Sequence, residues 1–277
     1  MRPVALPPAA RLTNRATPAA TWHVVSAGAV VGVLGGMIGL GGAEFRLPLL
    51  IGLFGFLALQ AVILNKAMSL LVVATALPAR LAAVPLASLT PHWPVVLNLL
   101  AGTLVGAWAG ASWAVRMRTS TLYRVLAVML VLIALALYAS HAGPVEPLDL
   151  PTAAQVPAGV VAGLLIGVVA AVMGVAGGEL LIPTIVLLYA VDIKTAGSLS
   201  LAVSLPTMLV AFARYSRDGS FTVLRDNRRF VVLMAGGSVF GTIVGGLAVG
   251  LVSDSVLIPV LTAVLLLSAR TVWKHRE

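Results

Sequence analysis

One six-residue segment of this chain occurs twice, 135 positions apart, with a similar pattern of glycines and the same closing glutamate. The copies are Gly39–Glu44 and Gly174–Glu179, and a proline follows each glutamate four residues later, Pro48 or Pro183. A glycine cluster, a carboxylate and a proline are all unfavourable inside a helix that lies in lipid. Their occurrence twice, in register, predicts two related halves interrupted at the same depth, as in membrane proteins that bind a ligand between repeats.

The regions around these segments are strongly apolar. The chain is 60% hydrophobic and only 10% charged, and its mean hydropathy is +1.07. A soluble domain of this size would have too few polar residues for its surface. Several apolar runs are long enough to cross roughly 30 Å of hydrocarbon at about 1.5 Å per residue. The predicted fold class is therefore an all-α polytopic membrane protein.

The repeat extends well beyond the glycine-rich segment. Glycines at four-residue spacing match at the same offset: Gly102, Gly106 and Gly110 against Gly237, Gly241 and Gly245. Such faces of small residues let helices approach closely in lipid. Each half contains five apolar segments, of which the second is too short to span upright, so each half is expected to contain a short or re-entrant, glycine-broken hairpin. The segments are 22–43, 46–58, 62–88, 94–115 and 120–140, then 157–176, 179–191, 195–213, 229–251 and 254–270.

The placement of charge predicts the orientation. Most Lys and Arg residues lie in the N-terminal region, around 116–124, around 214–229 and after residue 269, whereas the stretch 139–156 has Glu146 and Asp149 but no Lys or Arg. The positive-inside rule places the basic stretches in the cytoplasm. An odd number of segments per half then gives the second repeat inverted topology. The expected organisation is a cytoplasmic tail (1–21), repeat 1 (22–140), an extracytoplasmic linker (141–156), repeat 2 (157–270) and a cytoplasmic tail (271–277).

Composition also excludes several kinds of site. The net charge of +9 is split into short clusters suited to anionic lipid headgroups, and no contiguous basic face with aromatic readers indicates nucleic-acid binding. The chain has no cysteine, and its four histidines are scattered, so we expect no metal site and no cofactor. The glycine faces leave a homo-oligomer possible.

The two interruptions predict a polar site for an anion. Broken backbone at membrane depth is tolerated only against protein or a watery cavity, and helix N-termini exposed there attract negative charge. Two inverted interruptions would meet near the midplane. The glycines expected to line the site are Gly39, Gly41, Gly42, Gly174, Gly177 and Gly178.

Glu44 and Glu179 have two interpretations. A carboxylate at membrane depth costs about 2.5–3.5 kcal/mol on insertion scales, so it usually has a purpose. Each glutamate either carries a coupling proton or accepts hydrogen bonds from its own opened backbone, as a cap does.

Other polar residues flank the interruptions. Arg46 stands where the second copy has Leu181, and it either pairs with Glu44, contacts a substrate or snorkels to the interface. On the third segments, Asn65 and Ser69 share a helical face, as do their counterparts Ser200 and Ser204. Lys66 is a candidate to neutralise an anion. These side chains, together with Ser198, either bind substrate or hydrogen-bond between helices.

Taken together, Gly39–Gly42 with Pro48, Gly174–Gly178 with Leu181-Ile182-Pro183, and the downstream Ala196–Ser204 resemble the duplicated signature of the TauE/SafE sulfite exporter family. The resemblance covers residues 25 to 270. It implies a bacterial or archaeal inner-membrane permease that exports sulfite, sulfoacetate or a related organosulfur anion. Ala43 and Ala176 stand where many members have a fuller glycine run.

Other classes fit the sequence less well. An importer or a channel for another small anion could use the same scaffold. An intramembrane enzyme would need a nucleophile with a base, but Ser198 and Ser200 have no histidine at comparable depth. A purely structural protein would leave two carboxylate-bearing interruptions without purpose. We therefore expect a secondary transporter rather than an enzyme.

Overall fold

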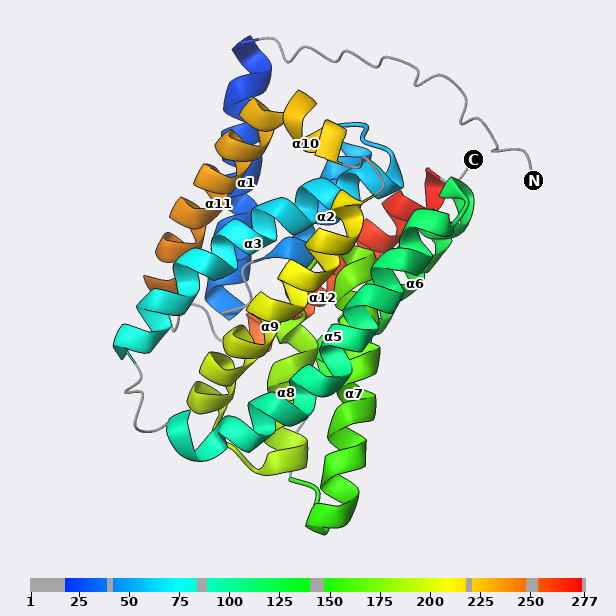
Figure 1. The fold of residues 1–277 in the computed structure, drawn as a ribbon. Coiled ribbons are helices and arrows are strands. Elements are labelled where there is room, and N and C mark those ends of the chain that lie inside the picture. The colour runs from blue at the N-terminus through cyan, green and yellow to red at the C-terminus, as the bar shows by residue number, and fades with distance from the viewer. Residues whose placement is uncertain are drawn as a thin grey trace, which may run out of the picture.

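The computed structural model of the chain describes residues 18–38, 42–83, 89–139, 147–217, 221–247 and 254–275. Regular structure in these residues is helical, without a strand, which confirms the predicted all-α class (Figure 1). Six helices in the described part of the chain are long and apolar enough to cross a membrane. The protein is thus a multi-pass membrane protein.

The helices follow the two predicted halves. The first half contains α1 (Pro18–Ile38), α2 (Ala43–Gly52), α3 (Ala58–Ala83), a short 3-10 turn η1 (Thr90–His92), α5 (Trp93–Arg116) and α6 (Thr119–Ala139). The second half contains α7 (Thr152–Met173), α8 (Gly178–Tyr189), α9 (Ile193–Ser216), α10 (Phe221–Asp226), α11 (Arg228–Leu247) and α12 (Asp254–Lys274). The short helix α10 lies in a region predicted to be a loop.

The half-helices α2 and α8 follow the glycine-rich segments. They have 10 and 12 residues, too few to cross a bilayer alone. Each is preceded by a glycine with positive φ, 69° at Gly42 and 85° at Gly177, a conformation that other residues rarely adopt. The sixth residue of each half-helix is a proline, Pro48 or Pro183, so the helix supplies no N–H to the glutamate carbonyl four residues earlier.

Each half-helix folds back along the helix before it. In the second repeat, the Leu148 backbone N–H, just before α7, donates to the Leu187 carbonyl (2.8 Å). Gln155 Nε2, in the first turn of α7, donates to the Leu188 carbonyl (2.6 Å), so both bonds join this region to the end of α8. The hairpins α1/α2 and α7/α8 open toward opposite ends of the molecule (Figure 1). This is the inverted arrangement expected from the charge pattern.

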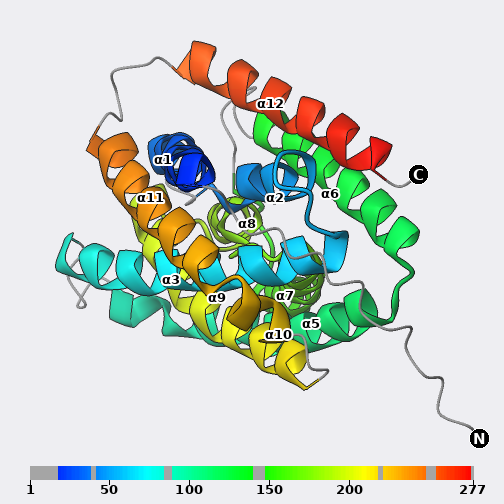
Figure 2. The same cartoon turned by 90° about the horizontal axis from the view of Figure 1, so that it is seen from above.

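The repeats are interleaved rather than side by side. The first helix of each repeat packs along the helix of the other repeat that corresponds to its fourth apolar segment, α1 on α11 and α7 on α5 (Figure 2). A Cβ added at Gly241 would collide with the carbonyl oxygen of Ala29, and one added at Gly106 would collide with that of Leu164. This contact confirms the close-packing faces predicted from the glycine spacing.

The basic clusters gather at one end of the molecule. The start of α1, helix α10 and the end of α12 all lie at this end (Figure 1). Here Arg214 donates from Nε to Ser112 Oγ (2.7 Å), and the guanidinium carbons of Arg214 and Arg217 lie 5.8 and 4.8 Å from the ring centre of Trp108. Such cation–π contacts at the end of a span are typical of side chains that anchor helices at an interface.

Candidate functional site

A buried polar cluster lies where the two interruptions meet. It combines Glu44 and Arg46 from the first turns of α2 with Asn65, Lys66 and Ser69 from α3, and none of these five side chains is more than 3% exposed. Glu179, in the first turn of α8, completes the cluster from the second repeat. Because charged groups are costly in such surroundings, the question is which partners hold each of them.

Arg46 is held by α3. Its Nη1 donates to Asn65 Oδ1 (3.4 Å) and to Ser69 Oγ (3.3 Å), and the side chain is 0% exposed. Full burial excludes the interpretation that Arg46 snorkels to the interface. One nitrogen reaches both side chains, which confirms that Asn65 and Ser69 share a face.

Asn65 bridges the interruptions of the two repeats. Its Nδ2 donates to the carbonyl of Ala43 (2.9 Å), at the start of α2, and to the carbonyl of Met173 (3.2 Å), at the end of α7. The counterpart Ser200 has a shorter side chain, and its Oγ donates to the Gly197 carbonyl of its own helix (2.9 Å). The bridging amide is therefore a feature of the first repeat.

Lys66 donates to two backbone carbonyls at the break after α7. Its Nζ donates to the carbonyls of Ala170 and Val175, both at 2.8 Å. Tyr215, on α9, adds a hydrogen bond from its hydroxyl to the Ala171 carbonyl (3.0 Å). A helix end buried away from water requires such partners. Lys66, for which the sequence predicted a role in neutralising an anion, thus caps the helix end of the opposite repeat.

Tyr215 was not identified from the sequence. It stands in the last turn of α9, just after the apolar segment 195–213, where an aromatic residue ordinarily indicates core packing or an interfacial belt. Only the arrangement in space shows that its hydroxyl reaches the carbonyl of another helix.

Glu44 and Glu179 face each other across the repeat boundary. Both oxygens of Glu44 and Oε1 of Glu179 are buried, and no hydrogen-bond donor among the described residues reaches them. The Glu44 carboxyl therefore lacks the capping hydrogen bonds predicted for it, among the residues that the structure describes. The two carboxyl groups lie close enough to interact through their charges. Both are acceptors when ionised, so a hydrogen bond between them requires a proton on one.

The serines of α9 differ in their partners. Ser198 Oγ donates to the Lys194 carbonyl (3.4 Å), whereas Ser204 Oγ is buried and has no partner among the described residues. Ser69, the counterpart of Ser204, accepts from Arg46, but Leu181 occupies the position of Arg46 in the second repeat. Ser204 therefore offers a free hydroxyl on the α9 side.

The predicted glycines are only partly described. Gly39 and Gly41 lie outside the described residues, while Gly42 and Gly177 precede the half-helices and Gly178 begins α8. Gly174, with φ of 72°, ends α7. The described glycines thus shape both breaks, which leave the N-termini of α2 and α8 at the cluster.

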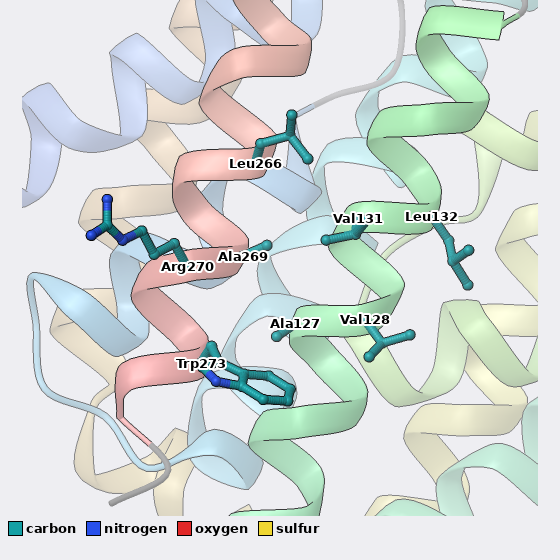
Figure 3. A pocket seen from close by; sticks show the side chains of 8 residues that line it. All are labelled: Ala127, Val128, Val131, Leu132, Leu266, Ala269, Arg270 and Trp273. Atoms are coloured by element: carbon teal, nitrogen blue, oxygen red, sulfur yellow. The ribbon is translucent and has the colours of Figure 1, made fainter.

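A groove between α6 and α12 is lined mostly by apolar side chains, unlike the buried polar cluster (Figure 3). Arg270 points away from the groove. Among the described residues, no three of His, Cys, Asp and Glu lie close enough together to hold a metal ion. The buried cluster is therefore the candidate functional site. The residues that line the groove are Ala127, Val128, Val131, Leu132, Leu266, Ala269, Arg270 and Trp273.

Comparison with known proteins agrees with the duplicated architecture. The family model described as "Sulfite exporter TauE/SafE" matches residues 4–137 and 146–277, nearly the whole chain in two stretches. No curated protein and no solved structure matches the chain.

Proposed function

We propose a specific substrate class and direction from one premise: the chain belongs to the TauE/SafE sulfite exporter family and is a membrane transporter. The proposed substrate is a small sulfur-containing anion, such as sulfite or the organosulfonate sulfoacetate. The proposed direction is export, and the proposed site lies between the inverted repeats, near the middle of the membrane.

One observation carries this proposal, the convergence of two half-helix N-termini with two buried cations. Helices α2 and α8 begin at the cluster, and Arg46 and Lys66 stand beside them with 0% exposure. Helix N-termini carry partial positive charge and free N–H groups, and guanidinium groups bind oxyanions. Ser69 and Ser204 supply hydroxyls from the third helix of each repeat, where an oxyanion could accept hydrogen bonds.

The proposed location is a bacterial or archaeal inner membrane, with both chain termini in the cytoplasm. The basic clusters at one end of the molecule support this orientation under the positive-inside rule. An interior-negative potential favours outward movement of an anion by about 2.3 kcal/mol per elementary charge per 100 mV. Export as a uniport is therefore energetically feasible, and proton coupling through Glu44 and Glu179 is a further part of the proposal.

Thermal stabilisation of the purified protein tests the substrate class. We expect sulfite, thiosulfate or sulfoacetate to raise the melting temperature in a saturable manner, because a ligand that binds only the folded state stabilises it. Sulfate, taurine and simple carboxylates form the comparison panel. If no sulfur oxyanion changes the melting temperature, the assignment of substrate is wrong, although the fold is unaffected.

Flux measurements in liposomes test the transport mode. A transporter predicts saturable flux of the stabilising anion, whereas flux that stays proportional to concentration would indicate a channel. An importer on the same scaffold would concentrate the anion inside cells, and an exporter would protect cells that are loaded with it.

A further inference from the structure

An anion-binding site does not by itself explain why two carboxyl groups, one from each repeat, lie beside it. Glu44 is 1% exposed and comes from the first repeat, and Glu179 is partly exposed and comes from the second. The two carboxyl groups lie close enough to interact through their charges, and no donor among the described residues reaches the buried oxygens of Glu44 or Oε1 of Glu179. Two like charges this close in a buried site are strongly unfavourable unless a proton neutralises one of them.

Neutral groups accept the hydrogen bonds described above for the two cations of the cluster. The hydrogen bonds of Arg46 described above go to Asn65 and Ser69, and those of Lys66 go to backbone carbonyls. Arg46 interacts with Glu44, and Lys66 with Glu179, through their charges. The cluster thus contains two cations and a carboxyl pair whose charge depends on one proton.

The other charged residues on the helices packed against α2 and α8 stand near the ends of those helices, away from the cluster in sequence. Helix α7 has no Asp, Glu, Lys, Arg or His. On the remaining helices packed against α2 and α8, every such residue other than Lys66 stands within the first or last two turns. These residues are His23 on α1, Arg80 on α3, Arg124 on α6, Lys194 and Arg214 on α9, and Asp254, Arg270 and Lys274 on α12. The charge of the cluster is therefore set by its own four ionisable side chains.

We propose that Glu44 and Glu179 form a single proton-binding site, and that this proton and a small oxyanion beside Arg46 and Lys66 bind cooperatively. This inference rests on the proposed function and specifies its coupling. With both carboxylates ionised, the net charge of the four side chains is zero. With one proton shared between the two carboxylates, the net charge is +1. An oxyanion binds the positive cluster better than the neutral one, and by linkage the bound oxyanion favours proton uptake to the same degree.

The sign of the coupling follows from this cooperativity. Proton and anion occupy the transporter together and cross in the same direction, rather than in exchange. A divalent oxyanion that leaves with one proton still carries one negative charge outward, so the membrane potential still favours export. Glu179, the more exposed of the two, is the residue through which the proton is exchanged.

Binding of sulfoacetate and of thiosulfate as a function of pH tests this proposal, because both keep their charge between pH 6 and 8. For the wild-type protein we expect affinity to fall with rising pH, by up to about tenfold per pH unit, the slope for one linked proton. Titration calorimetry in two buffers of different ionisation enthalpy should show up to one proton taken up per anion bound at pH 8. Anion binding without proton uptake would overturn the coupling and leave the proposed function intact, whereas the absence of binding by any sulfur oxyanion overturns both.

Glutamine variants supply the decisive contrast. Glu44→Gln and Glu179→Gln each leave one carboxylate with two cations, the charge of the protonated pair. Each should therefore bind sulfoacetate at pH 8 more tightly than wild type, and its affinity should fall less steeply with rising pH. Asp149→Asn, at an exposed position of the linker, is the matched control and should behave as wild type. A purely structural role predicts weaker or unchanged binding in the variants, and either result contradicts the proposal. The calorimetric measurement on the wild type decides the question if the variants do not fold.

Discussion

Lys66 of the first repeat donates a hydrogen bond of 2.8 Å from Nζ to the backbone carbonyl of Val175 in the second. This bond crosses the boundary between two halves that are related by sequence but differ in charge. At the position of Lys66 the second repeat has Leu201, which offers no donor. The first repeat therefore supplies polar partners for the interruption of its counterpart, and the symmetry of the scaffold does not extend to the chemistry of the site.

Replacement of Lys66 tests this capping role. Lys66→Leu, which introduces the residue of the second repeat, should destabilise the protein by about 1–3 kcal/mol, because two buried carbonyls lose a donor. Thermal unfolding in detergent measures the effect. Lys194→Leu, at an exposed position in the first turn of α9, is the control. Equal melting temperatures for the two variants would show that the hydrogen bonds of Lys66 contribute nothing to stability.

Arg46 is expected to be essential for flux. Arg46→Gln should reduce anion efflux from proteoliposomes about ten- to a hundredfold, the range expected from losing one hydrogen bond to a charged group. Arg270→Gln removes an arginine that points away from its neighbouring groove, and it should transport at the wild-type rate. Efflux within twofold of wild type in Arg46→Gln would show that this guanidinium does not contact the substrate.

The packing of α1 against α11 can be tested with two glycines of the same helix. A Cβ at Gly241 would collide with the Ala29 carbonyl oxygen, whereas one at Gly236 meets nothing within 4 Å. Gly241→Ala should lower stability by about 1–3 kcal/mol through overpacking. Gly236→Ala should leave stability unchanged or raise it by up to about 1 kcal/mol, because alanine favours helix. The reverse order of melting temperatures would exclude this contact between the repeats.

Asp192 gives a pH-dependent contribution outside the spanning segments. Its Oδ1 accepts from the backbone N–H groups of Lys194 and Thr195, both at 3.0 Å, at the start of α9. Hydrogen bonding from Thr195, chiefly from its side chain, lowers the pKa of Asp192 below its ordinary value of 3.8. A lowered folded-state pKa means that this contribution is complete well above pH 4 and is lost as the pH falls through the folded-state pKa.

Removal of this cap should cost about 1 kcal/mol at neutral pH. Asp192→Ala should therefore melt below wild type at pH 7, and the difference should shrink as the pH falls below about 4. Asp149→Ala, in the exposed linker, should match wild type at both pH values. A difference that persists unchanged at low pH would indicate that the carboxylate does not act as a cap.

Much of the fold could be predicted because membrane insertion leaves strong signals in sequence. The repeated motif located both interruptions, and the lengths of the apolar runs predicted the short helices α2 and α8. The helical spacing of Asn65 and Ser69 placed them on one face, where Arg46 reaches both. These features depend on local periodicity, which a single sequence records.

Features that depend on which helices meet could not be predicted in the same way. Four-residue glycine spacing shows that another helix will pack closely on that face, but it does not identify this helix. The packing of α1 on α11 and of α7 on α5 therefore emerged only from the structure. For the same reason the contact of Tyr215 with Ala171 and the bridging role of Asn65 were not predicted. Their partners are backbone carbonyls, which every residue carries and no motif marks.

The crossed pairing of α1 with α11 has a consequence for biosynthesis. Helix α1 leaves the ribosome before the other helices of the two repeats, yet α11, which covers its glycine face, is made only after most of the chain has been translated. Until then the helix that packs on this face in the folded protein is absent. Helix α7, by contrast, finds α5 already in the membrane as it emerges. The packing of the first repeat can therefore be completed only after α11 of the second repeat has been synthesised.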